Sequence, residues 1–195
     1  QVPDAPGHDI TLVDYLMSLS LIAGVWAVSE SRRLLVGTLT VTVVALVLRW
    51  VPFLPPGRME SALRWGAALV TMAMFSVMII AQAVRRGPVT VHRILGAIAA
   101  YLLLGLTWAC AYQLLNVVHP GAFSGAVPAE HRLQHWIYYS LVTLTTTGYG
   151  DVTPVHQIAR SLATMEAMIG QLYPAILIAR MVSLEVQAQS RKQNS

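Results

Sequence analysis

Long runs of apolar residues, separated by short polar segments, dominate this sequence. Five of them, at residues 10–28, 34–48 with its flanks, 62–84, 94–118 and 155–184, approach or exceed the about 20 residues that a helix needs to cross a bilayer core. None alternates with the period of two expected of a membrane β-strand. The pattern therefore predicts an all-α integral membrane protein with five transmembrane helices.

The composition agrees with this prediction. Of the 195 residues, 55% are hydrophobic and only 11% are charged, which is too little polar surface for a soluble domain of this size. The net charge of +4 comes from basic residues spread over the predicted helix ends, so it indicates no nucleic-acid partner. A single cysteine, Cys110, excludes an intrachain disulfide and a cysteine metal cluster. The sequence contains no nucleophile–base constellation, so we do not expect an enzyme.

One motif lies between the last two apolar runs. Residues 145–151 read Thr-Thr-Thr-Gly-Tyr-Gly-Asp, and an aromatic-rich segment, residues 136–140, precedes them. This arrangement resembles the selectivity filter of the tetrameric potassium-channel superfamily, with its pore helix and both flanking helices in the right order. The resemblance implies a pore domain over residues 89–185, with three peripheral helices over residues 1–88 and a short cytoplasmic tail over residues 186–195. Within the pore domain we expect an outer helix at 89–118, a turret at 119–129, a pore helix at 130–145, a filter at 146–151 and an inner helix at 155–185.

The filter motif has a physical rationale. Rings of backbone carbonyls can replace the hydration shell of K⁺, and pointing successive carbonyls at one axis needs residues that adopt positive φ. Gly148 and Gly150 do this without a Cβ clash. The resemblance assigns the K⁺ sites to Thr146, Thr147, Gly148, Tyr149 and Gly150, with the Thr146 hydroxyl completing the innermost site.

Other residues would support the filter. By resemblance, Asp151 caps its outer mouth and accepts a hydrogen bond from Tyr138, while Tyr149 packs against the surrounding pore helices. Thr147 stands where the family more often has valine or isoleucine, so its hydroxyl needs a partner behind the filter. Val142 stands where some members carry an acidic partner for the outer aspartate, so that pairing is absent.

The last apolar run contains the candidate gate. Gly170 lies where the family commonly has a hinge glycine, and Pro174 removes a helix hydrogen bond one turn later. A glycine that merely eases helix packing is an equal alternative. The same matching directs Gln171, Pro174 and Ile178 toward a central cavity.

Glu166 is a carboxyl in the middle of the same run, off the predicted cavity face. An intramembrane acid is a functional-site hypothesis by default. We expect it to accept hydrogen bonds from the back of the pore helix, from Thr143 or Thr147, or to be protonated. A structural role is favoured over ion binding.

Topology follows from placing the filter outside the cell. Eight basic residues then fall inside and five outside, which satisfies the positive-inside bias. We therefore expect a multi-pass protein of the cell membrane with its N-terminus outside and its C-terminus in the cytoplasm. No helix carries regularly spaced arginines, so a voltage sensor is not expected.

One filter loop per chain requires four chains, so we expect a C4 homotetramer in the lipid bilayer. The predicted function is passive, potassium-selective conduction with K⁺ as the permeant ion. A less selective monovalent cation channel, a potassium transporter subunit and a non-conducting regulatory subunit remain alternatives. The sequence leaves open an unidentified gating ligand or partner.

Overall fold

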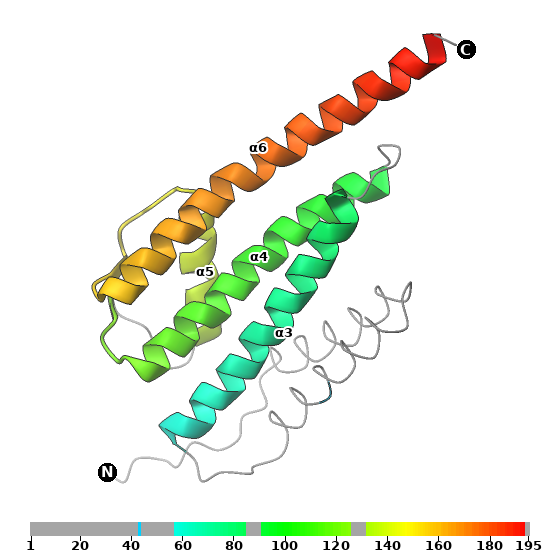
Figure 1. Ribbon diagram of the computed structural model, residues 1–195. Coiled ribbons are helices and arrows are strands. Elements are labelled where there is room, and N and C mark those ends of the chain that lie inside the picture. Colours follow the sequence, from blue (N-terminus) through cyan, green and yellow to red (C-terminus); the bar gives the residue numbers. More distant parts are fainter. Residues whose placement is uncertain (1–42, 44–56, 85–90, 126–131, 194–195) are drawn as a thin grey trace, which may run out of the picture. The chain divides into compact units, whose positions relative to one another are not determined.

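The computed structural model describes residue 43 and residues 57–84, 91–125 and 132–193. This part of the chain is almost entirely helical (Figure 1). Its elements are α3 (Arg58–Val84), α4 (Val91–Val118), β1 (Phe123–Ser124), α5 (Arg132–Leu144), β2 (Thr153–Pro154) and α6 (Gln157–Gln193). The helices expected at residues 10–28 and 34–48 lie outside the described residues, apart from residue 43.

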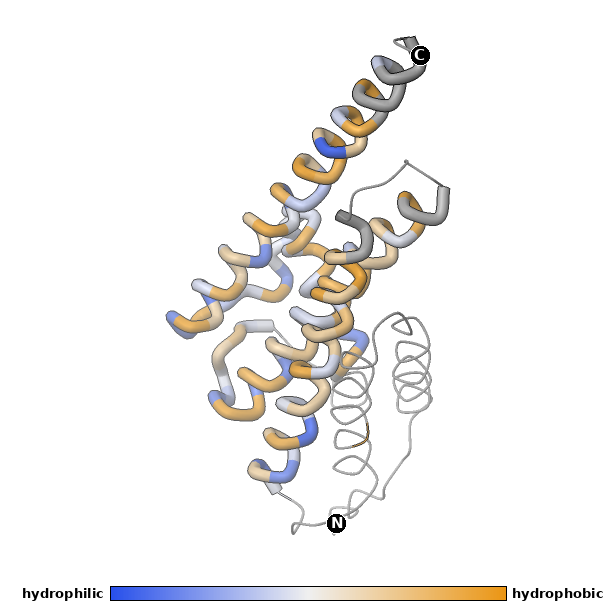
Figure 2. The backbone as a smooth tube through the Cα atoms, turned by 45° about the vertical axis from the view of Figure 1, so that its right-hand side comes forward, coloured by the Kyte–Doolittle hydropathy of each residue, from blue (hydrophilic) through white to orange (hydrophobic). Residues whose placement is uncertain are grey.

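Three of the described helices are long and apolar enough to cross a membrane. The candidate spans are Arg58–Ala81 of α3, Ile94–Val118 of α4 and Gln157–Leu184 of α6, and Figure 2 shows apolar residues along them. They correspond to the last three apolar runs of the sequence. The mostly helical membrane character is thus confirmed for the described residues, while a total of five helices and fourfold assembly stay predictions.

The helix α4 contacts each of the other three described helices. One polar contact joins α4 to α3: the hydroxyls of Ser76 and Thr107 lie 2.9 Å apart. Each hydroxyl also lies within hydrogen-bonding distance of a carbonyl of its own helix, at 2.9 and 2.8 Å. Pairing the two hydroxyls satisfies both in an apolar surrounding, and this fixes how α3 and α4 align.

The helix α5 is too short to cross a membrane. Its 13 residues would extend for about 20 Å, less than the about 30 Å of a bilayer core. One side of α5 packs on α4 and β1 through four rings: Tyr112, Phe123, Trp136 and Tyr139. Ring centroids lie 4.8 Å apart for Tyr112 and Tyr139 and 4.7 Å for Phe123 and Trp136, both edge to face. This aromatic cluster holds α5 against α4 and leaves its C-terminal end to support the loop that follows.

Residues 119–125 of the expected turret are more ordered than the sequence suggests. Strands β1 and β2 pair antiparallel, with Phe123 opposite Pro154 and Ser124 opposite Thr153. The Ala122 carbonyl also accepts hydrogen bonds from the amides of Val155 and His156, at 2.9 and 3.1 Å. We call the paired segments 122–125 and 153–156 the strap. Strands of two residues show no alternating pattern, which explains why the sequence predicted a turret without strands.

The helix α6 also differs from the expected inner helix. It begins at Gln157 and continues beyond the expected end at residue 185 to Gln193. The polar residues after 185 carry no proline or glycine that would end a helix. The segment expected as a short tail is therefore largely a continuation of α6.

Candidate functional site

The backbone between α5 and the strap alternates in handedness. Thr146, Gly148 and Gly150 have φ values of 57°, 61° and 82°, while the residues between them stay at negative φ. Gly148 and Gly150 accommodate this freely, but a left-handed conformation costs a β-branched residue roughly 1–2 kcal/mol. Thr146 is the only non-glycine residue with positive φ in the described part of the chain. The glycines of the motif predicted positive φ only at their own positions, so the positive φ of Thr146 was not expected from the sequence.

The amides of this loop point back toward α5. Thr146 donates to the Thr143 carbonyl at 2.9 Å, and the amides of Thr147 and Gly148 share the Val142 carbonyl at 2.9 and 3.4 Å. Among the described residues, the carbonyls of residues 146–149 accept no hydrogen bond. The loop residues are exposed in the single chain, so these oxygens form an open row beside the negative end of the α5 dipole. Such a row attracts cations.

The threonine hydroxyls order the start of the loop. Thr145 donates to the Leu141 carbonyl at 2.7 Å, and its hydroxyl lies 2.8 Å from that of Thr147. Thr145 is therefore the partner that the Thr147 hydroxyl required. The Thr146 hydroxyl donates to the Thr145 carbonyl at 2.7 Å and accepts from Nε2 of Gln171 at 2.8 Å.

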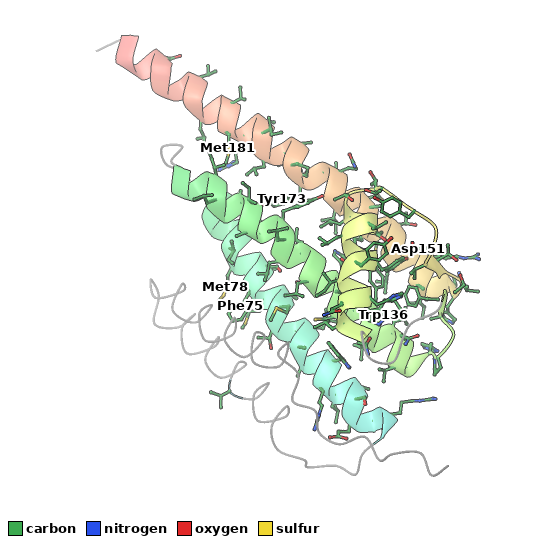
Figure 3. All side chains as sticks on the ribbon, turned by 180° about the vertical axis from the view of Figure 1, so that it is seen from behind. Phe75, Met78, Trp136, Asp151, Tyr173 and Met181 are labelled. Atoms are coloured by element: carbon green, nitrogen blue, oxygen red, sulfur yellow. The ribbon has the colours of Figure 1, made fainter. Side chains whose placement is uncertain are left out.

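At the C-terminal end of the loop, Tyr138, Tyr149 and Asp151 lie near one another. Figure 3 labels Asp151. The rings of Tyr138 and Tyr149 stack with centroids 6.3 Å apart and planes 3° from parallel. A hydrogen bond from the Tyr138 hydroxyl to the Asp151 carboxylate raises the pKa of Tyr138. This contact links α5 to the C-terminal end of the loop.

Glu166 is completely buried where α4, α5 and α6 meet. It accepts hydrogen bonds from Tyr112 of α4 and from Ser140 of α5, both at 2.5 Å. The Ser140 hydroxyl also lies 2.7 Å from the Gly105 carbonyl of α4. The carboxyl therefore ties the three helices together behind the loop, as a structural role requires.

The expected donors to Glu166 were wrong. Thr143 donates instead to the Tyr139 carbonyl at 2.8 Å, and Thr147 contacts Thr145. Ser140 lies one turn before Thr143 on the same side of α5, so α6 meets α5 closer to its start than expected. Tyr112 was also missed, although a hydroxyl within the apolar run 94–118 needs a partner and so signals a helix contact.

Gly170 packs directly on the C-terminal end of α5. A Cβ atom added there would overlap the Leu144 carbonyl oxygen, and Gly170 itself is buried. This contact gives the glycine a packing role, and its action as a hinge stays a prediction. α6 continues through Pro174 as one helix. Gln171 and Ile178 are exposed in the single chain, and Gln171 reaches the loop.

Comparison with known proteins shows which families this chain is similar to. Residues 100–187 match the family model described as "Ion channel". The protein LctB of Geobacillus stearothermophilus is 38% identical over 86 residues, which are 42% of this chain and 62% of that protein. Two pore potassium channel c of Oryza sativa subsp. japonica is 33% identical over 90 residues, 46% of this chain and 18% of that protein.

A third relative is the inward rectifier potassium channel Kirbac3.1 of Paramagnetospirillum magnetotacticum, 30% identical over 80 residues, 39% of this chain and 24% of that protein. The chain covers less than two thirds of the length of each of these relatives. The described residues thus form a mostly helical structure with three candidate membrane spans, and residues 100–187 of the chain are similar to an ion channel family. The residues matched by the family model, 100–187, contain most of α4, all of α5, the loop and most of α6.

Proposed function

We propose that this chain forms a potassium-selective channel in which K⁺ moves passively down its electrochemical gradient. The observation that carries the proposal is the loop at residues 146–150, where alternating φ signs leave a row of carbonyl oxygens without hydrogen bonds. Carbonyl dipoles can replace the hydration shell of K⁺ without the tight binding that full charges would give.

The proposed ion sites are formed by the carbonyls of residues 146–149, and the Thr146 hydroxyl completes the innermost site. The negative end of the α5 dipole favours a cation at the inner end of this row. Hydrogen bonds from the loop amides to the Val142 and Thr143 carbonyls keep the peptide groups from rotating, so the carbonyls stay on the side that would face the ion. Tyr138, through Asp151, steadies the outer end.

A single row of oxygens cannot surround an ion, so the proposal includes a homotetramer with fourfold symmetry. Exposed apolar residues on α6 support it, because they need lipid or neighbouring chains to cover them: Met165, Met168, Leu172, Ile176, Ile178 and Val182. We further propose a multi-pass arrangement in the cell membrane, with the N-terminus outside and the C-terminus in the cytoplasm.

The test is a flux assay on purified protein in liposomes under a potassium gradient, repeated with sodium. We compare wild type with Gly148→Ala and with Gly96→Ala as a matched control. Neither added methyl group would meet an atom within 4 Å in the chain, but only Gly148 has a positive φ of 61°. The comparison therefore isolates backbone conformation from crowding within the chain.

We expect potassium flux from wild type and Gly96→Ala, little sodium flux, and loss of flux in Gly148→Ala. Equal sodium and potassium flux would favour a less selective cation channel. A correctly assembled wild-type protein that passes neither ion would refute autonomous conduction and favour a regulatory subunit.

A further inference from the structure

The contact between α6 and the end of α5 brings one polar side chain of α6 to the loop. Gly170 lies against the Leu144 carbonyl, so α6 approaches as closely as a backbone can. The next residue, Gln171, then donates from Nε2 to the Thr146 hydroxyl at 2.8 Å. Both side chains are exposed in the single chain, so this hydrogen bond lies on the open side of the loop.

Among the described residues, the Thr146 hydroxyl has two hydrogen-bond partners. A hydroxyl has one proton and two lone pairs. Its proton goes to the Thr145 carbonyl at 2.7 Å, and Gln171 occupies one lone pair at 2.8 Å. One lone pair is therefore left for a cation, and the partly positive N–H group of Gln171 lies next to the same oxygen.

We propose that Gln171 weakens cation binding at the innermost site of the filter by holding the Thr146 hydroxyl. This inference rests on the proposed function, because it assumes that this hydroxyl contacts the permeant ion. Gln171 is a positioning residue that acts through Thr146. An N–H donor competes with the ion for the oxygen, and a site that releases its ion readily favours conduction.

Barium is a suitable probe because Ba²⁺ is close to K⁺ in size and carries twice the charge, so it lodges where the oxygen cage binds cations most strongly. We would record potassium currents from purified protein in planar bilayers and add Ba²⁺ on the side where α6 ends. The variant Gln171→Met keeps the length of the side chain and removes the donor. One hydrogen bond of about 1 kcal/mol corresponds to a roughly fivefold change in affinity, so Ba²⁺ should block Gln171→Met about fivefold more tightly than wild type.

A second variant, Gln171→Glu, also removes the donor and adds negative charge, so it should tighten the block further. Leu172→Met is the matched control, since Leu172 is the next residue of α6, is 54% exposed and makes no hydrogen bond to the loop. Its block should equal that of wild type. In a Thr146→Ala background, Gln171→Met should have no effect on Ba²⁺ block.

The outcomes separate this inference from the proposed function. If wild type conducts potassium and Ba²⁺ blocks Gln171→Met no more tightly than wild type, the role of Gln171 is overturned and the proposed function stands. The role of Gln171 is also overturned if Gln171→Met tightens the block equally in the wild-type and the Thr146→Ala backgrounds. Wild type that passes no potassium would overturn both.

Discussion

Replacing Glu166 with leucine and Tyr112 with phenylalanine, singly and together, tests whether the buried carboxyl ties the helices of this domain. In wild type, Tyr112 donates to Glu166 at 2.5 Å, and Glu166 is fully buried. Glu166→Leu leaves the Tyr112 hydroxyl without a partner, while Ser140 keeps its contact with the Gly105 carbonyl at 2.7 Å. An orphaned buried hydroxyl costs about 1–3 kcal/mol.

The double variant removes both members of the pair, so no hydroxyl is orphaned. Each single substitution should lower the free energy of unfolding by about 1–3 kcal/mol. The double variant should be more stable than the sum of the two losses predicts, by about 1–2 kcal/mol, near the upper end for hydrogen bonds between membrane helices. The assay is denaturant unfolding of purified protein in detergent micelles, followed by helix content.

Tyr173→Phe supplies the control, because the Tyr173 hydroxyl donates to the Ala97 carbonyl at 2.8 Å and shares no hydrogen-bond partner with Tyr112. Combined with Tyr112→Phe, its effect should be additive within about 0.5 kcal/mol. Additive losses for Glu166→Leu and Tyr112→Phe would refute the reasoning, since they would show that the two groups contribute to stability independently.

Two further predictions concern contacts near the loop. Gly170→Ala should lower the yield and thermal stability of folded protein, because its methyl group would overlap the Leu144 carbonyl. The control is Gly66→Ala, at a helix position with open space, which should keep or slightly raise yield and thermal stability. Equal melting curves for the two variants would disprove the close contact between Gly170 and Leu144. Tyr138→Phe removes the hydrogen bond to Asp151, so potassium currents should start at a normal size and decline faster than in wild type. Unchanged current decay would show that this bond does not steady the outer end.

The sequence predicted the described helices well because their signals are local. Apolar runs of membrane-spanning length set α3, α4 and α6, and the motif at residues 145–151 marked the loop between α5 and the strap. Gly148 and Gly150 were expected at positive φ and have it. Hydrophobic periodicity and the conformational freedom of glycine depend on a few neighbouring residues, so helices and positive φ angles can be predicted from a single sequence.

The remaining features depend on contacts between distant segments. Glu166 was singled out as a buried acid, but its donors depend on how α6 meets α5, which the sequence does not specify. The left-handed backbone of Thr146 is imposed by amides bound to the end of α5, against the preference of the residue itself. The roles of the candidate ion sites stay predictions, as does the hinge at Gly170.

The strap has a practical consequence for labelling experiments. The start of the loop is fixed by the Val142 and Thr143 carbonyls, and the strap that follows it is fixed by the Ala122 carbonyl. At Gly125, with φ at 110°, even a methyl group would lie 2.6 Å from the Asp151 carbonyl oxygen. A fluorophore or epitope inserted into the strap would therefore pull directly on the loop, although the segment looks like an ordinary surface connection in sequence. An exposed position such as Ser190, far along α6, allows a reporter group to be attached without that disturbance.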